Sequence, residues 1–258
     1  MNRKLKKKPI VEAFLDIRWQ IKKSEDGLTV DETYNRRFPN FFSLFFPDYP
    51  YNEILPASQI PDQLAGYVVK HRLRKGEGLY PLVQLGPGIA SFNMGENYEW
   101  PEFERAGKDF IKKLLDIAPE TTQPVPYNSV LFRCCNAIEV EPDMGDFLEI
   151  VKSKLNTSLD LPQQITGPSK SERCSGLNIE FARKIENPAG IASLKISSGY
   201  KEKKPAMIWE ITVNSIGSDV PQSLDDFKIW LDHAHQEVED WFFALIEGEL
   251  CEYFGVDQ

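Results

Sequence analysis

The chain of 258 residues has little of what most metal and catalytic sites require. It contains three histidines, and its four cysteines (Cys134, Cys135, Cys174 and Cys251) lie in no spacing typical of a zinc site. His233 and His235 are two residues apart on an expected helix, so they point about 200° from each other. We expect them on a solvated helix face, and we predict no metal site and no cofactor.

Motifs for nucleotides and for nucleophilic catalysis are also missing. The chain has no Gly-x4-Gly-Lys-Ser/Thr loop and no Gly-x-Ser-x-Gly elbow, and Gly86-Pro87-Gly88 favours a plain hairpin turn. Among the acids, Glu12 and Asp16 share one face of the first expected strand, and Glu180 and Glu210 fall in mid-strand positions. A solvated sheet face is the simpler interpretation, so we predict no catalytic residue and lean against an enzyme.

No stretch approaches the roughly 18 consecutive apolar residues of a membrane helix. The basic start, Met1 to Lys8, is followed by Glu12 where a signal peptide would need an apolar segment. We therefore expect a soluble, cytoplasmic protein with reduced cysteines and no membrane association.

The formal net charge of −9 disfavours binding to DNA or RNA, because the average field repels polyanions. Nucleic acid could bind only through the local basic segments at Arg3 to Lys8, His71 to Lys75 and Lys201 to Lys204. Short basic segments of this kind are more often solvated loops or strand ends.

The hydrophobic pattern of the first half predicts a strand, a helix, three strands and a helix. Residues 10–21 alternate with the period of two of a half-buried strand, and Asp31 is the expected cap of an aromatic helix that runs to Phe46 and is bent or broken at Pro39. Strands are expected at 66–74, 80–85 and 89–94, and a helix from Trp100 to about Ile117.

The second half repeats this order. Strands are expected at 129–140, 176–182, 191–197 and 207–214, with a short helix at 144–155 and a long final helix capped by Ser223. We therefore predict an α+β fold of two pseudo-repeated β-α-β-β-β-α halves, residues 1–122 and 123–258, with antiparallel sheets backed by helices in one fused structural domain. The element order resembles that of saddle-shaped folds such as the TATA-binding protein, an analogy that carries no function.

Several segments resemble a sporadically distributed, largely uncharacterised family of prokaryotic proteins. The resemblance rests on five segments that span nearly the whole chain: Pro9-Ile10-Val11-Glu12-Ala13, Phe45-Phe46-Pro47, Val83 to Pro87, Tyr98 to Phe103, and Leu231 to His235 through Phe254-Gly255. The family usually has an Arg and Tyr-Ile-Asn in the strand after the first long helix, where this chain has Arg133 and Cys135-Asn136, without the tyrosine. The resemblance implies genes that move with defence islands, toxin–antitoxin pairs or CRISPR loci, and it carries over no catalytic residue.

Three hypotheses about function remain open. The first is a non-enzymatic accessory or regulatory protein that binds a protein partner such as a defence effector, through a sheet face or aromatic helices. The second is a small-ligand or nucleotide-binding protein, with or without catalytic activity, that uses the cleft between the halves. The third is a nucleic-acid-binding subunit of a larger complex, and a homodimer is compatible with each. The candidate partner-binding residues are Arg3, Lys4, Lys6, Lys7, Lys8, His71, Arg72, Arg74, Lys75, Trp230 and Trp241.

Overall fold

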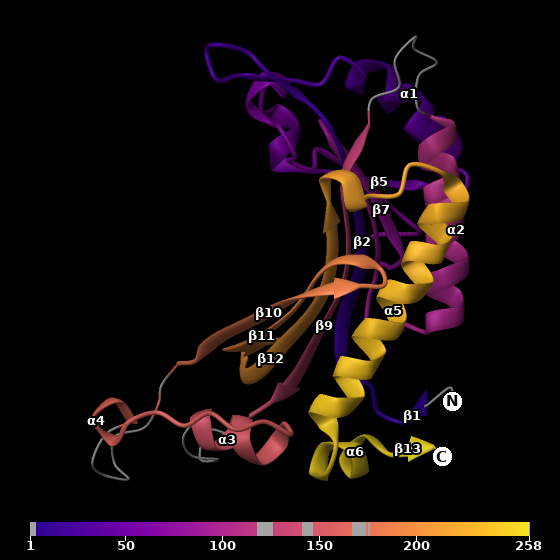
Figure 1. The fold of residues 1–258 in the computed structure, drawn as a ribbon. Helices are drawn as coiled ribbons and strands as arrows, with labels where there is room; N and C mark the ends of the chain where they lie inside the picture. The colour runs from indigo at the N-terminus through magenta and orange to yellow at the C-terminus, as the bar shows by residue number, and fades with distance from the viewer. Residues whose placement is uncertain (1–3, 118–125, 141–146, 167–173, 175, 258) are drawn as a thin grey trace.

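A computed structural model describes residues 4–117, 126–140, 147–166, 174 and 176–257. Its centre is one antiparallel sheet of nine strands in the order β10-β11-β12-β9-β2-β8-β7-β6-β5, which confirms the α+β class (Figure 1). The strands are β2 (Ile10–Trp19), β5 (Tyr51–Ile54), β6 (His71–Arg74), β7 (Leu82–Gly86), β8 (Ile89–Met94), β9 (Tyr127–Glu139), β10 (Asn178–Glu186), β11 (Ala189–Lys201) and β12 (Lys204–Ile216). Two small sheets pair β1 (Lys4–Leu5) with β13 (Val256–Asp257), and β3 (Lys22–Lys23) with β4 (Thr29–Val30).

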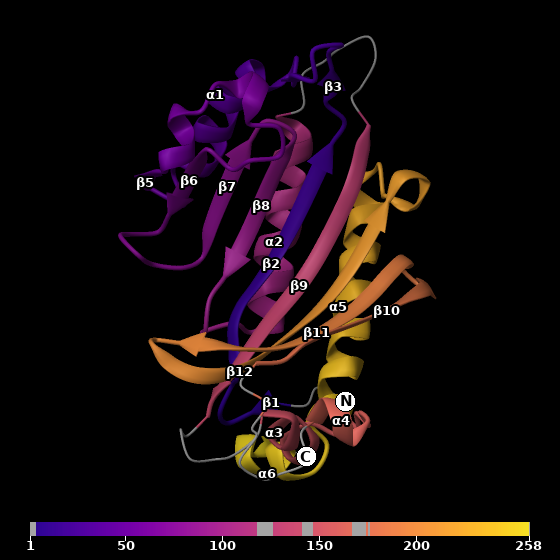
Figure 2. The ribbon, with the colours of Figure 1, turned by 90° about the vertical axis from the view of Figure 1, so that its left-hand side faces the viewer.

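The longer helices cover one face of this sheet. Figure 1 shows α2 (Trp100–Asp116) and α5 (Leu224–Ile246) side by side on that face with α1 (Tyr34–Phe45) at one end, and Figure 2 views the opposite face with α2 and α5 behind the strands. The shorter helices are α3 (Phe147–Lys154), α4 (Gln163–Thr166) and α6 (Glu249–Phe254), and 3₁₀ turns form at Pro56–Gln59, Asp62–Leu64 and Gly217–Asp219. No helix among the residues described combines the length and apolar character needed to cross a bilayer.

The alternating pattern of β2 decides which side chains face the helices. Ala13, Leu15, Ile17 and Trp19 are buried, and the residues between them face the other side of the sheet. β9 lies next to β2 and alternates in the same way, with Phe132 buried under the helices. The two central strands therefore form one core beneath α2 and α5.

The strand order is symmetric about the central β2–β9 pair. β8, β7 and β6 follow outward on one side, and β12, β11 and β10 follow on the other, while β5 adds an edge strand to the first side alone. The internal duplication and the likeness to the TATA-binding protein stay predictions. The predicted boundary at residue 122 lies outside the described residues, and strands from both sides of it share the sheet.

Several boundaries differ from the sequence-based prediction. Residues 66–70 precede β6 instead of extending it, β5 was not predicted, and β10, β11 and β12 are longer than expected. α1 is one helix that contains Pro39 and has Thr33, not Asp31, at its N-cap. Asp31 instead accepts hydrogen bonds from the Trp19 indole and the Gly88 amide, both at 2.8 Å, and from the Thr33 amide and hydroxyl.

Two helix predictions are confirmed almost to the residue. α2 begins at Trp100 with Pro101 in its first turn, where a missing amide hydrogen has no cost. The Ser223 hydroxyl caps α5 by accepting a hydrogen bond from the Asp226 amide at 3.2 Å. Of the short helix predicted at 144–155, residues 147–154 are helical and 144–146 lie outside the described residues.

Candidate functional site

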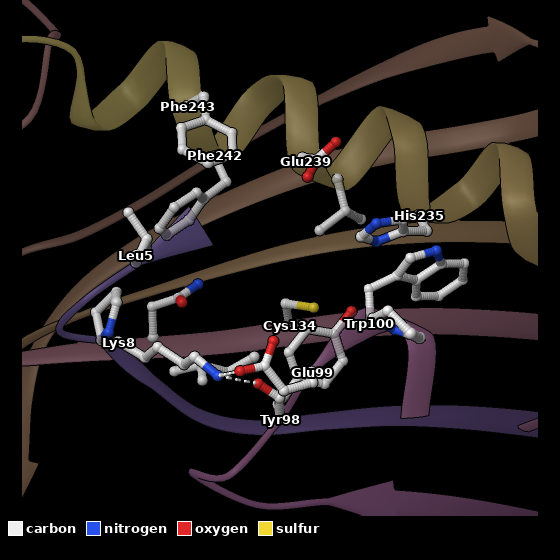
Figure 3. Close-up of a pocket in the computed structure, with 15 residues that line it drawn as sticks. Leu5, Lys8, Tyr98, Glu99, Trp100, Cys134, His235, Glu239, Phe242 and Phe243 are labelled. Carbon is white, nitrogen blue, oxygen red and sulfur yellow. Dashed lines mark hydrogen bonds and ion pairs between the residues drawn. The ribbon is translucent and has the colours of Figure 1, made fainter. Parts of the chain in front are cut away.

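A pocket of about 160 Å³ lies between α5, the start of α2 and the N-terminal segment (Figure 3). Both predicted halves contribute to its walls, which are largely apolar. The lining residues are Leu5, Lys8, Pro9, Ile10, Tyr98, Glu99, Trp100, Pro101, Cys134, Asn136, His235, Val238, Glu239, Phe242 and Phe243.

Local structure explains why these side chains converge. The turn before α2 places Tyr98 and Glu99 at the N-terminal end of this helix. The alternation of β9 directs Cys134 and Asn136 to the helix-covered face of the sheet. On α5, residues at steps of three and four share one face, which brings His235, Val238, Glu239 and Phe242 to the pocket. In Figure 3 the side chains of α5 lie across the pocket from Tyr98, Glu99 and Cys134.

His235 forms a flat wall of the pocket together with Trp100. The two rings stack with centroids 3.6 Å apart and planes 11° apart. Burial lowers the pKa of His235 to about 4, so the imidazole is neutral near pH 7. The prediction that His235 lies on a solvated helix face is therefore wrong, because α2 covers this part of α5.

Two buried polar atoms around the pocket have no hydrogen-bond partner among the described residues: Asn136 Nδ2 and His235 Nδ1. Asn136 is only 2% exposed. Burial beside the Cys134 thiol raises the pKa of Tyr98 well above its usual value, so Tyr98 remains a neutral phenol. An unpaired buried amide costs about 1–3 kcal/mol, which a polar atom entering the pocket would recover.

Lys8 forms part of the pocket wall. Its ammonium group donates a hydrogen bond to the Tyr98 carbonyl oxygen at 2.8 Å and forms an ion pair with Glu99. The N-terminal segment is also held by the β1–β13 pairing and by the Lys7 amide, which donates to the Phe254 carbonyl at 3.0 Å. Leu5 and Lys8 are thereby fixed over the pocket.

The pocket has the features of a binding site and lacks an activated nucleophile. Burial raises the pKa of the Cys134 thiol, and burial also raises that of Cys135, on the opposite face of β9, to about 11. Neither cysteine is a thiolate near pH 7. No group of three or more His, Cys, Asp or Glu side chains among the described residues could hold a metal ion.

The described part of the predicted basic segment at the N-terminus packs against the C-terminal end of the chain. Arg3 lies outside the described residues, and of Lys4 only its backbone in β1 is described. Lys6 takes part in contacts near α6, where its amide donates to the Phe254 carbonyl, and the Lys7 ammonium lies 4.6 Å from the centre of the Tyr253 ring.

In the other two basic segments, four of the cationic side chains pair with carboxylates. Arg72 and Arg74 both pair with Glu53, and the adjacent arginines lower the pKa of that carboxyl. His71 lies under α1 with its ring 4.0 Å from that of Phe38, and burial lowers its pKa to about 4, whereas Lys75 is exposed. In the third segment, Lys201 pairs with Glu96 and Lys204 with Glu139.

Of the two candidate tryptophans of α5, Trp230 packs inside the molecule and Trp241 is partly buried. Trp230 is 4% exposed, and its indole donates a hydrogen bond to the Ser215 hydroxyl at 2.7 Å. Trp241 is partly buried against Phe181, and its indole donates to Glu237 at 2.8 Å. Trp230 therefore contributes to the core and leaves no accessible surface for a partner.

The uncovered face of the sheet carries Glu12 and Asp16, as the alternation of β2 predicted. Glu12 accepts hydrogen bonds from the Asn93 amide at 2.9 Å and the Tyr80 hydroxyl at 3.1 Å. Burial raises the pKa of Asp16 to about 6 although its side chain is 16% exposed. Residues four apart in a strand are separated by about 13 Å, so these two carboxyl groups cannot act on one bond as an acid–base pair.

The structure thus defines an α+β protein with one nine-stranded sheet, helices on one of its faces, and a largely apolar pocket beneath two of these helices. Comparison with protein-family models and with curated protein sequences finds no match. The resemblance to the prokaryotic family stays an expectation.

A ligand site between the two halves was one hypothesis drawn from the sequence, but the residues of this pocket were not predicted. Three of the five segments that carry the family resemblance, around Pro9, Tyr98 and His235, meet at its walls. The family resemblance of these three segments was the signal in the sequence that could have pointed to the pocket. That the segments lie close together follows only from tertiary packing, such as that of α2 on α5.

Proposed function

We propose that this protein binds a small, uncharged molecule with a single aromatic or heteroaromatic ring in the pocket between α5, the start of α2 and the N-terminal segment. This develops the hypothesis of a small ligand between the two halves. The observation that carries it is the Asn136 amide, which lines the cavity, is 2% exposed and has a nitrogen without a hydrogen-bond partner among the described residues.

The polar atoms around the pocket define what the ligand must offer. An acceptor oxygen on the ligand would take a hydrogen bond from Asn136, and the ring nitrogen of His235 offers a second polar contact. A few polar atoms in an otherwise apolar concave site are typical of small-molecule sites. They set the orientation of the ligand, while the apolar walls supply most of the binding free energy.

The volume of the pocket and the charged groups around it further restrict the class of ligand. A cavity of about 150 Å³ lined by apolar side chains holds benzene, so the 160 Å³ here suits one ring with a small substituent. A charged ligand would lose its hydration without gaining a free counter-ion, because Lys8 already pairs with Glu99, His235 is neutral, and Glu239 already takes part in another interaction. We therefore favour a neutral ligand.

Titration calorimetry with benzamide, phenol and benzene tests the proposal. Benzamide and phenol should bind more tightly than benzene by about tenfold for each hydrogen bond gained. Asn136→Leu should weaken benzamide binding by about tenfold and leave benzene binding unchanged. The matched control is Asn128→Leu, because Asn128 lies on the same strand but donates to the Tyr67 hydroxyl, away from the pocket.

Two results would contradict this proposal. If none of the three compounds binds at about 10 mM, the unpaired atoms are satisfied by ordered water and the pocket is not a ring site. If Asn136→Leu leaves benzamide binding intact, the amide does not select the ligand.

A protein partner on the uncovered sheet face is the second candidate. The observation that favours it is the partly exposed Arg133 side chain, which Thr212 and Glu210 hold on this face. Association with a defence, toxin–antitoxin or CRISPR effector rests on the family resemblance, and a cytoplasmic location accords with the four free cysteines. Capture of a stoichiometric effector from the native host, lost on Arg133→Ala, would support this candidate.

A further inference from the structure

The strand β10 forms one edge of the nine-stranded sheet. It is nine residues long and pairs with β11 on one side, and no described strand pairs with its other side. Figure 2 shows β10 at the margin of the sheet. Alternate backbone N–H and C=O groups along this margin are therefore open to another strand.

The sequence of β10, Asn-Ile-Glu-Phe-Ala-Arg-Lys-Ile-Glu, is self-complementary about its central residue, Ala182. In an antiparallel pair with a copy of itself centred there, Glu180 lies opposite Lys184 of the partner subunit, and the twofold axis repeats this contact. Ile179 lies opposite Ile185 of the partner subunit, and Phe181 lies opposite Arg183 of the partner subunit. Opposite charges and apolar pairs in these positions stabilise antiparallel strands.

We infer that the protein forms a twofold homodimer by antiparallel pairing of β10 with β10 of a second copy. The sheet would then continue through both subunits. The inference does not depend on the ligand pocket, which lies beneath α2 and α5.

Neighbouring registers fit less well. A dimer centred on Arg183 would place Glu180 opposite Glu186 of the partner subunit, which is repulsive. A dimer centred on Phe181 would place Glu180 opposite Ala182 of the partner subunit and would leave its charge unpaired. Only the register centred on Ala182 pairs both charges and uses all nine residues of the strand.

The surroundings of β10 suit this arrangement on both faces of the sheet. On the uncovered face, Glu180 lies opposite Lys195 of β11, so the dimer would place this carboxylate between two lysines. On the helix-covered face, Phe181 is 55% exposed beside Trp241, and Arg183 lies over the same indole and pairs with Glu237. Pairing would place Phe181 beside Arg183 of the partner subunit and remove part of the exposed ring from water.

Sedimentation velocity with charge variants tests the inference. The wild-type protein should sediment at twice its chain mass of 29.5 kDa. Lys184→Glu and Glu180→Lys should each weaken dimerisation by at least about tenfold, because each places like charges opposite one another at two symmetric positions. The double variant should dimerise again, and an equimolar mixture of the two single variants should form a heterodimer.

Cross-linking provides a readout that does not depend on the strength of association. In the register centred on Ala182 this residue lies opposite itself, with Cα atoms about 4.5–5.5 Å apart, within the range of about 4.4–6.8 Å that a disulfide spans. With Cys135, Cys174 and Cys251 changed to serine, Ala182→Cys should give a covalent dimer on oxidation. Lys184→Cys in the same background should not, because Glu180 of the partner subunit lies opposite.

Three outcomes would overturn the inference. A wild-type protein that is monomeric even at about 100 µM has no such interface of useful strength. If neither charge reversal weakens dimerisation, the dimer forms through another surface. Equal cross-linking of Ala182→Cys and Lys184→Cys excludes the register.

Discussion

The imidazole of His235 lies flat on the indole of Trp100, with ring centroids 3.6 Å apart. This stack joins α5 to the first turn of α2, two helices separated by more than a hundred residues of sequence. It also forms part of the pocket wall, so the packing that joins these helices also shapes the candidate site.

The first prediction concerns this stack. Trp100→Leu should expose His235 to water, so its pKa should rise from about 4 toward the ordinary value of about 6.5. The loss of ring contacts should lower the free energy of unfolding by about 2 kcal/mol. An NMR titration measures the pKa, and His71, which packs on Phe38 under α1, is the internal control whose pKa should not change.

The second prediction is acid lability caused by the two buried histidines. Burial lowers the pKa of His71 and of His235 to about 4, so between pH 6.5 and 4 the unfolded chain binds protons that the folded chain does not. Stability should therefore fall as the pH drops through this window, by about 1 kcal/mol for each partly buried histidine. Urea unfolding at several pH values measures it, and His235→Gln should flatten the slope. A slope unchanged in that variant would contradict the assignment.

The third prediction concerns Asp16, whose contribution to stability has the opposite pH dependence. Burial raises the pKa of Asp16 to about 6, so its carboxyl group stabilises the fold below pH 3.8, and this contribution is lost as the pH rises through 6. Asp16→Asn should therefore raise the free energy of unfolding by about 1 kcal/mol at pH 7 and by less at pH 4. Glu12→Gln is the matched control on the same face. It should destabilise, because Glu12 accepts hydrogen bonds from Asn93 and Tyr80.

The fourth prediction concerns Asp31, which links β2, the β7–β8 turn and the start of α1. Asp31→Ala should remove the acceptor of the Trp19 indole and of the Gly88 amide. Two buried or partly buried donors left unpaired should cost about 3 kcal/mol, measured by chemical denaturation. Asp26→Ala in an exposed turn should cost less than about 0.5 kcal/mol. Equal effects of the two substitutions would mean that Asp31 does not join these elements.

The local chemistry of the sequence determined the main elements of this protein. The alternation of residues 10–19 specified β2 and its buried face, the helical spacing after Trp100 specified α2, and Ser223 with Asp226 specified the start of α5. These signals act over a few residues, so they could be read without knowing the fold. Asp31 was misassigned as a helix cap because two of its hydrogen-bond donors, the Trp19 indole and the Gly88 amide, lie in other elements of the fold.

Only the tertiary structure decided where these elements meet. The pocket requires residues near positions 8, 99, 135 and 238 to converge, and no periodicity within one segment encodes that arrangement. His235 could not be recognised as buried because its cover, Trp100, comes from another helix. The position of β10 at the sheet edge likewise follows from the pairing order of nine strands. Burial, pKa and edge exposure depend on neighbours brought together by folding, whereas strand and helix patterns depend on residues already adjacent in the chain.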